Sequence, residues 1–349
     1  MIKITESEIE IIKEIESITG INIPRKSKAS YFSPGYILKG SSIRELYLIG
    51  IRMKKIPECI KRCSNLKTLY ANRNEMKIVP KWIFNKPSLE FLDLSVNPIK
   101  EYPDCSYENS NLKKVAMIKN PIRTLPSSFS RLRRLEQISL MSNNFSEFPS
   151  VLSKLENIKN LKFGNNSQAH FPDTFYKFRN LKKLDLRNNQ IKEIPPSIGM
   201  INTLEELNLS NNGLTSLPPT FKKLHNLKKL VLERNDYSNT PNVIEEMFSL
   251  TYLNLEYNDL KNFTSNLKKL VNLEVLLLSN NNIRKFNPKF SEKSKMKHIE
   301  LIGGNKIEDL PKFLTKLKDL EYLSFSDSNI DITNKKIQSI ITTINEKHG

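Results

Sequence analysis

The chain has 349 residues, a formal net charge of +18 and 38% hydrophobic residues, which predicts a folded protein rather than a disordered one. No run of about 18 uncharged apolar residues occurs, so we expect no membrane span. The N-terminus lacks the apolar core of a signal peptide, and the three cysteines are too few for a disulfide framework. These features together predict a cytoplasmic protein.

The basic character of the chain comes mainly from lysine, which outnumbers arginine by 42 to 13. Nucleic-acid and phosphate sites usually rely on arginine, whose planar guanidinium makes paired contacts with phosphate. Nucleic acid is therefore not the expected partner, although the charge should increase non-specific binding that weakens with salt.

The two ends of the chain have helical patterns. Thr5 and Glu8 match a capping box, and isoleucines at helical spacing follow, which predicts a helix near 6–18. A possible extra strand comes next, around Tyr36–Leu38. Isoleucines at helical spacing predict a second helix near 334–346. We expect residues 1–42 and 329–349 to form helical caps over the ends of one continuous domain; the alternative is that the two helices bind a partner.

Residues 43–328 contain a repeat of 23 residues, with one step of 24 before the last unit. The unit reads LxxLxLxxNxLxxLPxxLxxLxx, and its LxLxx stretch alternates apolar and polar residues like a half-buried strand. Strands of successive units should stack in parallel, with the rest of each unit returning behind them as a short helix or turn. The predicted fold is an α/β right-handed solenoid of about 13 repeats, with a curved parallel sheet on its concave face. The units open at Ile43, Leu66, Leu89, Leu112, Leu135, Ile158, Leu181, Leu204, Leu227, Leu250, Leu273, Met296 and Leu320.

Two polar columns run through the repeats. A proline column should direct the chain at the start of each return segment. An asparagine column should bond backbone groups that the turn after each strand leaves unpaired, so we interpret it as structural. The asparagines are Asn74, Asn97, Asn120, Asn143, Asn166, Asn189, Asn212, Asn235, Asn258 and Asn281.

Some repeats depart from the pattern. Gln168 replaces an apolar residue, Thr264 replaces a proline, and the next proline is displaced to Pro288. The twelfth repeat has one extra residue near Gly303-Gly304-Asn305, which makes it the best candidate for a kink. Local bulging without a function is the favoured interpretation of each.

The repeat, with its turns at Asn97-Pro98-Ile99 and Asn120-Pro121-Ile122, resembles the intracellular leucine-rich-repeat proteins of 23-residue type. These include the plant Ras-group proteins and the Scribble and Erbin scaffolds, and the match covers residues 43 to about 330. The resemblance implies a scaffold in signal transduction that binds a partner protein through its concave face. A small GTPase or a signalling regulator is the partner class that it implies. We expect a monomer without a cofactor.

Repeat positions 3, 5 and 7 should point outward from the concave sheet. Aromatic and apolar residues at these positions are typical anchors of protein interfaces, and the N-terminal zone is predicted to be the main hot spot. The predicted partner-binding residues are Tyr47, Ile49, Tyr70, Phe91, Ile118 and Met141 near the N-terminal end, Lys162 and Arg187 in the centre, and Tyr252, Leu277 and Tyr322 near the other end.

No catalytic or metal-binding arrangement is predicted. The four histidines lie in different repeats, and the pairing of His298 with Glu300 on one strand is expected by chance. Cys63 occupies a core position and should be buried. Cys59 and Cys105 hold equivalent positions two repeats apart, a separation of roughly 10 Å that is too long for a disulfide.

Two alternative functions remain open. The chain could bind a polyanion through lysines on its convex side, or it could regulate an enzyme on another chain. The convex lysines include Lys54, Lys61, Lys81, Lys86, Lys222 and Lys223.

Overall fold

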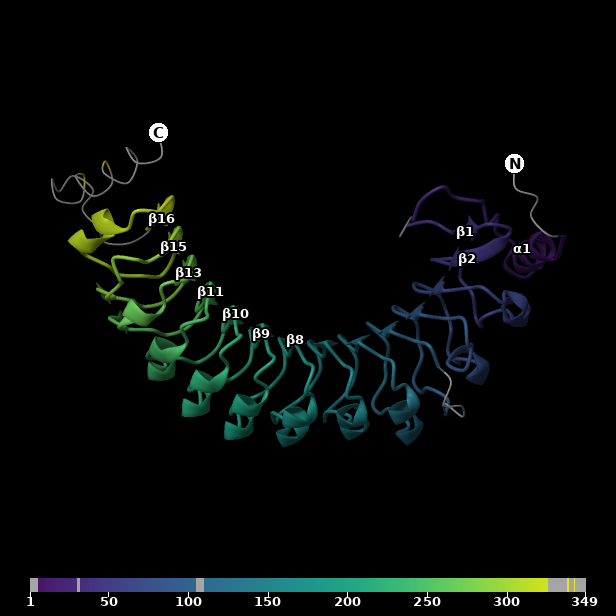
Figure 1. The fold of residues 1–349 in the computed structure, drawn as a ribbon, viewed down its shortest axis with the longest axis horizontal. Helices are drawn as coiled ribbons and strands as arrows, with labels where there is room; N and C mark the ends of the chain where they lie inside the picture. Colours follow the sequence, from purple (N-terminus) through teal and green to yellow (C-terminus); the bar gives the residue numbers. More distant parts are fainter. Residues whose placement is uncertain (1–5, 30–31, 105–109, 326–337, 339–341, 343–349) are drawn as a thin grey trace. The chain divides into compact units, whose positions relative to one another are not determined.

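The computed structural model describes residues 6–29, 32–104, 110–325, 338 and 342, and it divides into two compact units, residues 1–167 and 168–349. In each unit the strands lie along one side and the short 3-10 helices along the other (Figure 1). Thr5 of the predicted capping box lies outside the described residues, and the predicted C-terminal cap is described only at Gln338 and Thr342. None of the helices described has the length and apolar character that a membrane crossing requires.

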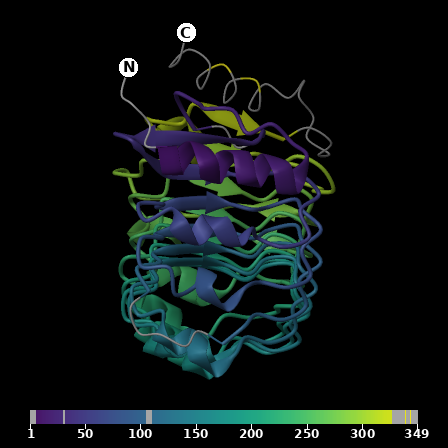
Figure 2. The ribbon, with the colours of Figure 1, turned by 90° about the vertical axis from the view of Figure 1, so that its right-hand side faces the viewer.

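The N-terminal unit begins with the helix α1 (Glu6–Thr19), which confirms the prediction of a helix near 6–18. Its isoleucines Ile11, Ile12 and Ile15 are buried, and α1 packs against the 3-10 helix η1 (Glu58–Arg62). The predicted extra strand is also present, as β1 (Gly35–Lys39), which pairs antiparallel with β2 (Ser42–Tyr47). Figure 2 shows α1 beside these two strands.

The remaining strands of the N-terminal unit are parallel and in register. Residues exactly one repeat apart face each other, as Leu46, Leu69 and Leu92 do. The strands after β2 are β3 (Thr68–Tyr70), β4 (Phe91–Asp93), β5 (Lys114–Ala116), β6 (Gln137–Ser139) and β7 (Asn160–Lys162). The 3-10 helices after η1 are η2 (Lys81–Ile83), η3 (Ser127–Arg131) and η4 (Ser150–Lys154), and each follows a proline.

The C-terminal unit repeats this arrangement. Its main strands are β8 (Lys183–Asp185), β9 (Glu206–Asn208), β10 (Lys229–Val231), β11 (Tyr252–Asn254), β13 (Val275–Leu277), β15 (His298–Glu300) and β16 (Tyr322–Ser324). Its 3-10 helices are η5 (Asp173–Lys177), η6 (Pro196–Met200), η7 (Pro219–Lys223), η8 (Asn242–Glu246), η9 (Leu267–Lys269) and η10 (Lys312–Lys316).

A second, two-stranded sheet forms where the proline column is interrupted. β12 (Asn262–Phe263) and β14 (Lys285–Phe286) pair in parallel on the return side of the C-terminal unit. The backbone N–H of Asn287, which takes the repeat position of the missing proline, donates to the Phe263 carbonyl at 2.9 Å. A proline has no N–H to donate, so the loss of the proline is what permits this pairing.

The asparagine column has the structural role that the sequence predicts. The Asn235 Nδ2 donates to the carbonyls of Leu209, Leu232 and Glu233 at 3.0–3.2 Å, and its Oδ1 accepts from the Leu214 N–H at 3.0 Å. One side chain therefore bonds groups of its own repeat and of the preceding one. Because these backbone groups lie away from water, leaving them unpaired would be costly.

The residue before each asparagine adopts the left-handed backbone conformation, which the repeat pattern did not predict. The φ angles in this column lie near +55°, and Val96, at φ 57°, is the β-branched member. A left-handed φ is unfavourable for most L residues and especially for β-branched ones. These residues are Arg73, Val96, Lys119, Ser142, Asn165, Asn188, Asn211, Arg234, Tyr257 and Asn280; Gly50 and Gly303 hold the same repeat position in the first and twelfth repeats, where the next residue is Ile51 or Gly304.

The extra residue of the twelfth repeat is absorbed in this same turn. Gly303 and Gly304 both have positive φ, at 64° and 66°, and Asn305 then takes the column position. Its Oδ1 accepts from the Ile283 N–H at 3.1 Å, and β15 still pairs with β13 and β16 in register. The insertion thus bulges the turn and leaves the sheet uninterrupted.

We expect the Asn143→Ala substitution to destabilise the fold by at least about 2 kcal/mol, because it removes the bonds of Asn143 to the Met117 carbonyl and to the Asn120 N–H, two buried backbone groups. Asn143 donates to the Met117, Leu140 and Met141 carbonyls at 2.8–3.2 Å. Urea unfolding followed by circular dichroism measures the change. The exposed neighbour Asn144, replaced by alanine, is the matched control. If both variants lose the same free energy of unfolding, the structural role of the asparagine column is contradicted.

Replacing Val96 by asparagine should stabilise the protein by about 1 kcal/mol, because asparagine tolerates the left-handed conformation better than a β-branched residue. Introducing a β-branched residue at an equivalent position, with Ser142→Val, should lower stability by a similar amount. Differential scanning calorimetry of the two variants tests the pair. If the Val96→Asn protein melts at a lower temperature than the parent, the contacts of the Val96 side chain, and not its backbone conformation, determine the stability at this position.

Candidate functional site

The open face of the sheet is the candidate site in each unit. Along a strand the central residue is buried and its neighbours face outward, as in Thr68–Leu69–Tyr70 of β3. Parallel pairing in register places equivalent residues of successive repeats side by side, roughly 4.8 Å apart. A ligand on this face would meet columns of side chains, each repeat contributing one residue to a column.

The N-terminal unit carries an aromatic ladder, made of Tyr47, Tyr70 and Phe91. The rings of Tyr47 and Tyr70 are stacked, with centroids 5.0 Å apart and planes 7° apart. Tyr70 and Phe91 have centroids 4.8 Å apart and are tilted by 44°. Tyr70 and Phe91 are half-buried, so part of each ring remains available for a partner while its neighbours hold it in place.

Tyr47 itself is fully buried, which corrects the prediction that it points into solvent. Tyr70 covers one side of its ring, and the Lys26 ammonium lies 5.4 Å from the ring centroid. Lys26 comes from the segment before β1, and its Nζ also donates to the Ser33 carbonyl at 2.6 Å. The N-terminal segment thus shields the first rung of the ladder, and the exposed part of the ladder consists of Tyr70 and Phe91.

Ile49 and Met141 are also buried, so the prediction that they are exposed is wrong as well. Both occupy repeat position 7, directly before the left-handed residue. The serines Ser95, Ser210 and Ser279 at the same position are buried too. Burial at position 7 differs between repeats, since Ile118 and Arg187 hold the same position and are half-buried.

Two predicted residues of the N-terminal unit do lie on the open face: Ile118 is half-buried and Lys162 is exposed. Asp93 also faces this side, next to Tyr70 in the register. Its carboxylate accepts from the Ser95 N–H at 2.8 Å, and burial raises the pKa of the Asp93 carboxyl above its usual value.

In the C-terminal unit the predicted residues also reach the open face. Arg187 is half-buried and forms an ion pair with Asp185 at 3.4 Å, and the ammonium of Lys229 lies 4.6 Å from the centre of the Tyr252 ring. Leu277 is half-buried and lies two strands from the exposed Tyr322. These residues come from strands of different repeats and form no continuous aromatic ladder like that of the N-terminal unit.

An acidic group on the same face was not predicted. Glu233, Glu256 and Glu300 lie on successive or nearby repeats, and burial raises the pKa of Glu256, with the Glu300 and Glu233 carboxylates raising it further. Asn254 donates to Glu256 at 3.0 Å. The positions were readable in the sequence, but their mutual influence depends on how the strands stack. Among the described residues, no group of three His, Cys, Asp or Glu side chains is arranged to hold a metal ion.

The His298–Glu300 pair lies within contact distance, with 3.3 Å between Nε2 and Oε2. Ser279 is close, but its hydroxyl donates to Glu300 at 3.3 Å and not to the imidazole. A nucleophilic serine needs a base positioned to take its proton. His298 instead stacks on Tyr322 with centroids 4.2 Å apart, so the geometry of the pair fits an aromatic surface better than a reaction centre.

Two of the three cysteines lie within the described residues. Cys63 is buried, as predicted, and Cys59 is buried as well. Burial raises the pKa of Cys59 to about 11, and the Glu14 carboxylate adds to this effect. A thiol with such a pKa stays protonated at neutral pH and is a poor nucleophile. Cys105 lies outside the described residues.

Comparisons with known proteins agree with the fold. Residues 165–300 match a family model described as "Leucine-rich repeat region". No curated protein matches the sequence. Among solved structures, a leucine-rich-repeat protein of Leptospira interrogans is 27% identical, with a TM-score of 0.64, and the match covers 86% of this chain and 94% of that one.

Two further structures share the fold at lower identity. The ectodomain of the Arabidopsis thaliana receptor kinase HAESA, solved with a peptide hormone ligand, is 21% identical with a TM-score of 0.68, and the match covers 94% of this chain and 62% of that one. An internalin of Listeria monocytogenes is 17% identical with a TM-score of 0.60, covering 97% and 93%. The repeat, the in-register parallel sheets and these likenesses together identify the fold as a leucine-rich-repeat solenoid.

Proposed function

We propose that the protein is a non-enzymatic interaction module that binds a partner protein through the open face of its sheet. Leucine-rich-repeat proteins are generally protein-interaction modules, which supports this proposal. The observation that carries it is the aromatic ladder, in which Tyr70 and Phe91 are partly exposed and held by ring contacts on both sides of Tyr70.

Preorganised aromatic side chains suit an anchor role for a physical reason. A ring that is already fixed loses little conformational entropy when a partner covers it, so more of the contact energy appears as affinity. Burying the remaining exposed surface of Tyr70 and Phe91 would also remove apolar area from water. The half-buried Ile118 on the same face extends this apolar surface.

The partner class, the location and the oligomeric state can be proposed as well. The resemblance to Ras-group and Scribble–Erbin scaffolds supports a small GTPase or a signalling regulator as the partner. The small number of cysteines, three in the whole sequence, supports a cytoplasmic location. We also propose that the protein acts as a monomer, with the helical ends capping the repeat array.

The polyanion alternative has weaker support. Lys86 is buried, contrary to its prediction as a surface cation, because it stands where other repeats have a core leucine such as Leu132. Its ammonium donates to the Lys61 carbonyl at 3.1 Å. Lys61 forms an ion pair with Glu58, so two of the six convex lysines are already engaged.

The double substitution Tyr70→Ala with Phe91→Ala should weaken partner binding by about 2 kcal/mol or more, roughly thirtyfold in Kd, because hot-spot rings carry most of an interface's energy. Partners are first identified by affinity capture at moderate salt with mass spectrometry. Isothermal titration calorimetry with the purified partner then measures the loss.

The control replaces two exposed aromatic residues of the return segments, Tyr176 and Phe248, by alanine. This variant should bind normally. Unchanged affinity of the ladder variant would refute the proposed site. If binding falls steeply with added salt and is unchanged in the ladder variant, the partner is a polyanion instead.

A further inference from the structure

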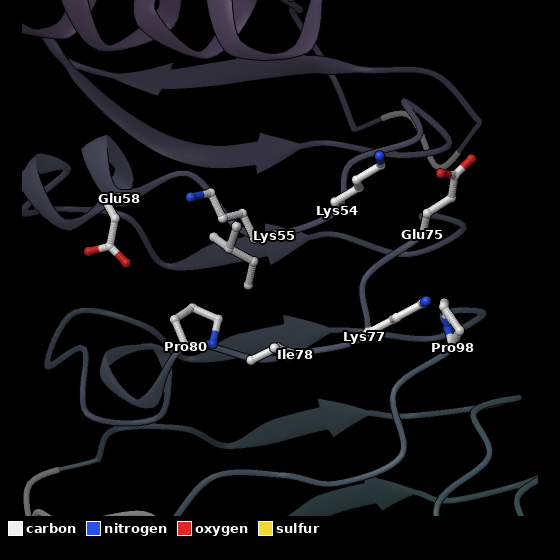
Figure 3. A pocket seen from close by; sticks show the side chains of 9 residues that line it. Lys54, Lys55, Glu58, Glu75, Lys77, Ile78, Pro80 and Pro98 are labelled. Atoms are coloured by element: carbon white, nitrogen blue, oxygen red, sulfur yellow. The ribbon is translucent and has the colours of Figure 1, made fainter.

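A groove of about 770 Å³ lies on one flank of the N-terminal unit, between the first two repeats, where the chain runs from the asparagine turn toward the 3-10 helix. Figure 3 shows Lys54 and Lys55 on one repeat and Lys77 and Ile78 on the next. The groove is separate from the open face of the sheet, so its role is not explained by the proposed function.

The apolar part of the groove is centred on Ile78, whose side chain is 73% exposed. Pro80 and the buried Ile56 also line the groove. A single exposed isoleucine is ordinary on a protein surface. At this repeat position, however, the other eleven of the first twelve repeats all have a polar or charged residue. The fold therefore does not require an apolar side chain there. Those residues are Lys55, Glu101, Thr124, Glu147, His170, Glu193, Ser216, Asn239, Asn262, Lys285 and Asp309.

The rim of the groove is basic. Lys54, Lys55 and Lys77 line it, and within the described residues none of the three takes part in an ion pair. Of the two acidic residues present, Glu58 is engaged by Lys61 and by the Trp82 Nε1, which donates at 3.0 Å, and these bonds lower the pKa of Glu58. Lys55 also acts on the Glu58 carboxylate, and Glu75 is the other acidic residue of the lining, so three ammonium groups face two carboxylates, one of which is already bonded to Lys61.

The cationic row continues along the same flank. Lys54 and Lys77 occupy repeat position 12, and the next two repeats have Lys100 and Arg123 there, both exposed. Four consecutive repeats thus have one cation each at this position, two of which line the groove. Such a row attracts an extended anionic chain, and the attraction is screened by salt.

We propose that this flank groove binds an acidic linear peptide segment of a partner protein. One apolar side chain of the peptide packs on Ile78 and Pro80, and carboxylates on either side of it pair with Lys54, Lys55 and Lys77. The apolar centre distinguishes this ligand from a nucleic acid, whose backbone would use the lysines but leave Ile78 uncovered. Peptide recognition by apolar anchors flanked by charges is a general mode of protein binding.

The test is fluorescence polarisation of the full chain with three labelled peptides. The first has two central leucines between runs of glutamate, the second has serines in place of the leucines, and the third has lysines in place of the glutamates. The first peptide should bind at least about tenfold more tightly than either of the others, because only it satisfies both the anchor and the charges.

Two variants assign the binding to the groove. Ile78→Ser, and Lys54→Glu combined with Lys77→Glu, should each weaken binding of the first peptide by about tenfold or more. Serine is the natural residue at the equivalent position in another repeat, Ser216, so the first variant leaves the core intact. Circular dichroism melting confirms that each variant is folded.

Matched controls use the C-terminal unit. Lys261→Glu combined with Arg284→Glu makes the same charge change at the same repeat position of two consecutive repeats, and Met200→Ser removes an apolar side chain that is 63% exposed. Both should bind the first peptide normally, and so should the Tyr70→Ala, Phe91→Ala variant, which separates this site from the sheet face. The proposal is overturned if the serine peptide binds as tightly, if the controls lose as much affinity, or if no peptide binds at millimolar concentration.

Discussion

The structure depends on how each turn pairs its buried backbone groups. A strand in this chain is only three residues long in most repeats, so the chain must turn inward while its carbonyls are still surrounded by neighbouring repeats. One asparagine side chain per turn bonds these carbonyls and also an N–H of the preceding repeat. Because an unpaired buried polar group is costly, this bonding fixes both the local turn and the register of 23 residues.

The same constraint explains where the repeat tolerates change. An added residue in the twelfth repeat is placed at Gly303 and Gly304, before the asparagine, so that Asn305 still reaches its partners. The loss of a proline at Thr264 lies after the asparagine, in the return segment, where the released chain pairs as β12 and β14. Neither change disturbs the strand side, and the open face can therefore carry residues that the fold does not dictate.

Stacking in register also organises the charges. Glu90 lies between Lys67 and Lys113 of the adjacent repeats, with contacts of 2.7 and 3.0 Å, and these two bonds lower the pKa of Glu90 to about 2. Similar pairs join Lys182 to Glu205 and Lys297 to Glu274. Several lysines are thus paired with carboxylates one repeat away, whereas Lys54, Lys55 and Lys77 of the flank groove form no such pair within the described residues.

The periodic spacing of leucine, asparagine and proline in the sequence determined the solenoid, the strand positions, the asparagine role and the burial of Cys63, because each of these follows from residues repeated at a fixed distance. Exposure on the open face was decided by the tertiary structure. Tyr47 is covered by Lys26 from outside the repeats, Ile49 and Met141 are buried although Ile118 at the same repeat position is half-buried, and Lys86 reaches a carbonyl of the preceding repeat. A repeat pattern specifies the side of the strand on which a residue lies. How much of its side chain stays exposed depends on side chains of other repeats and of the capping segment.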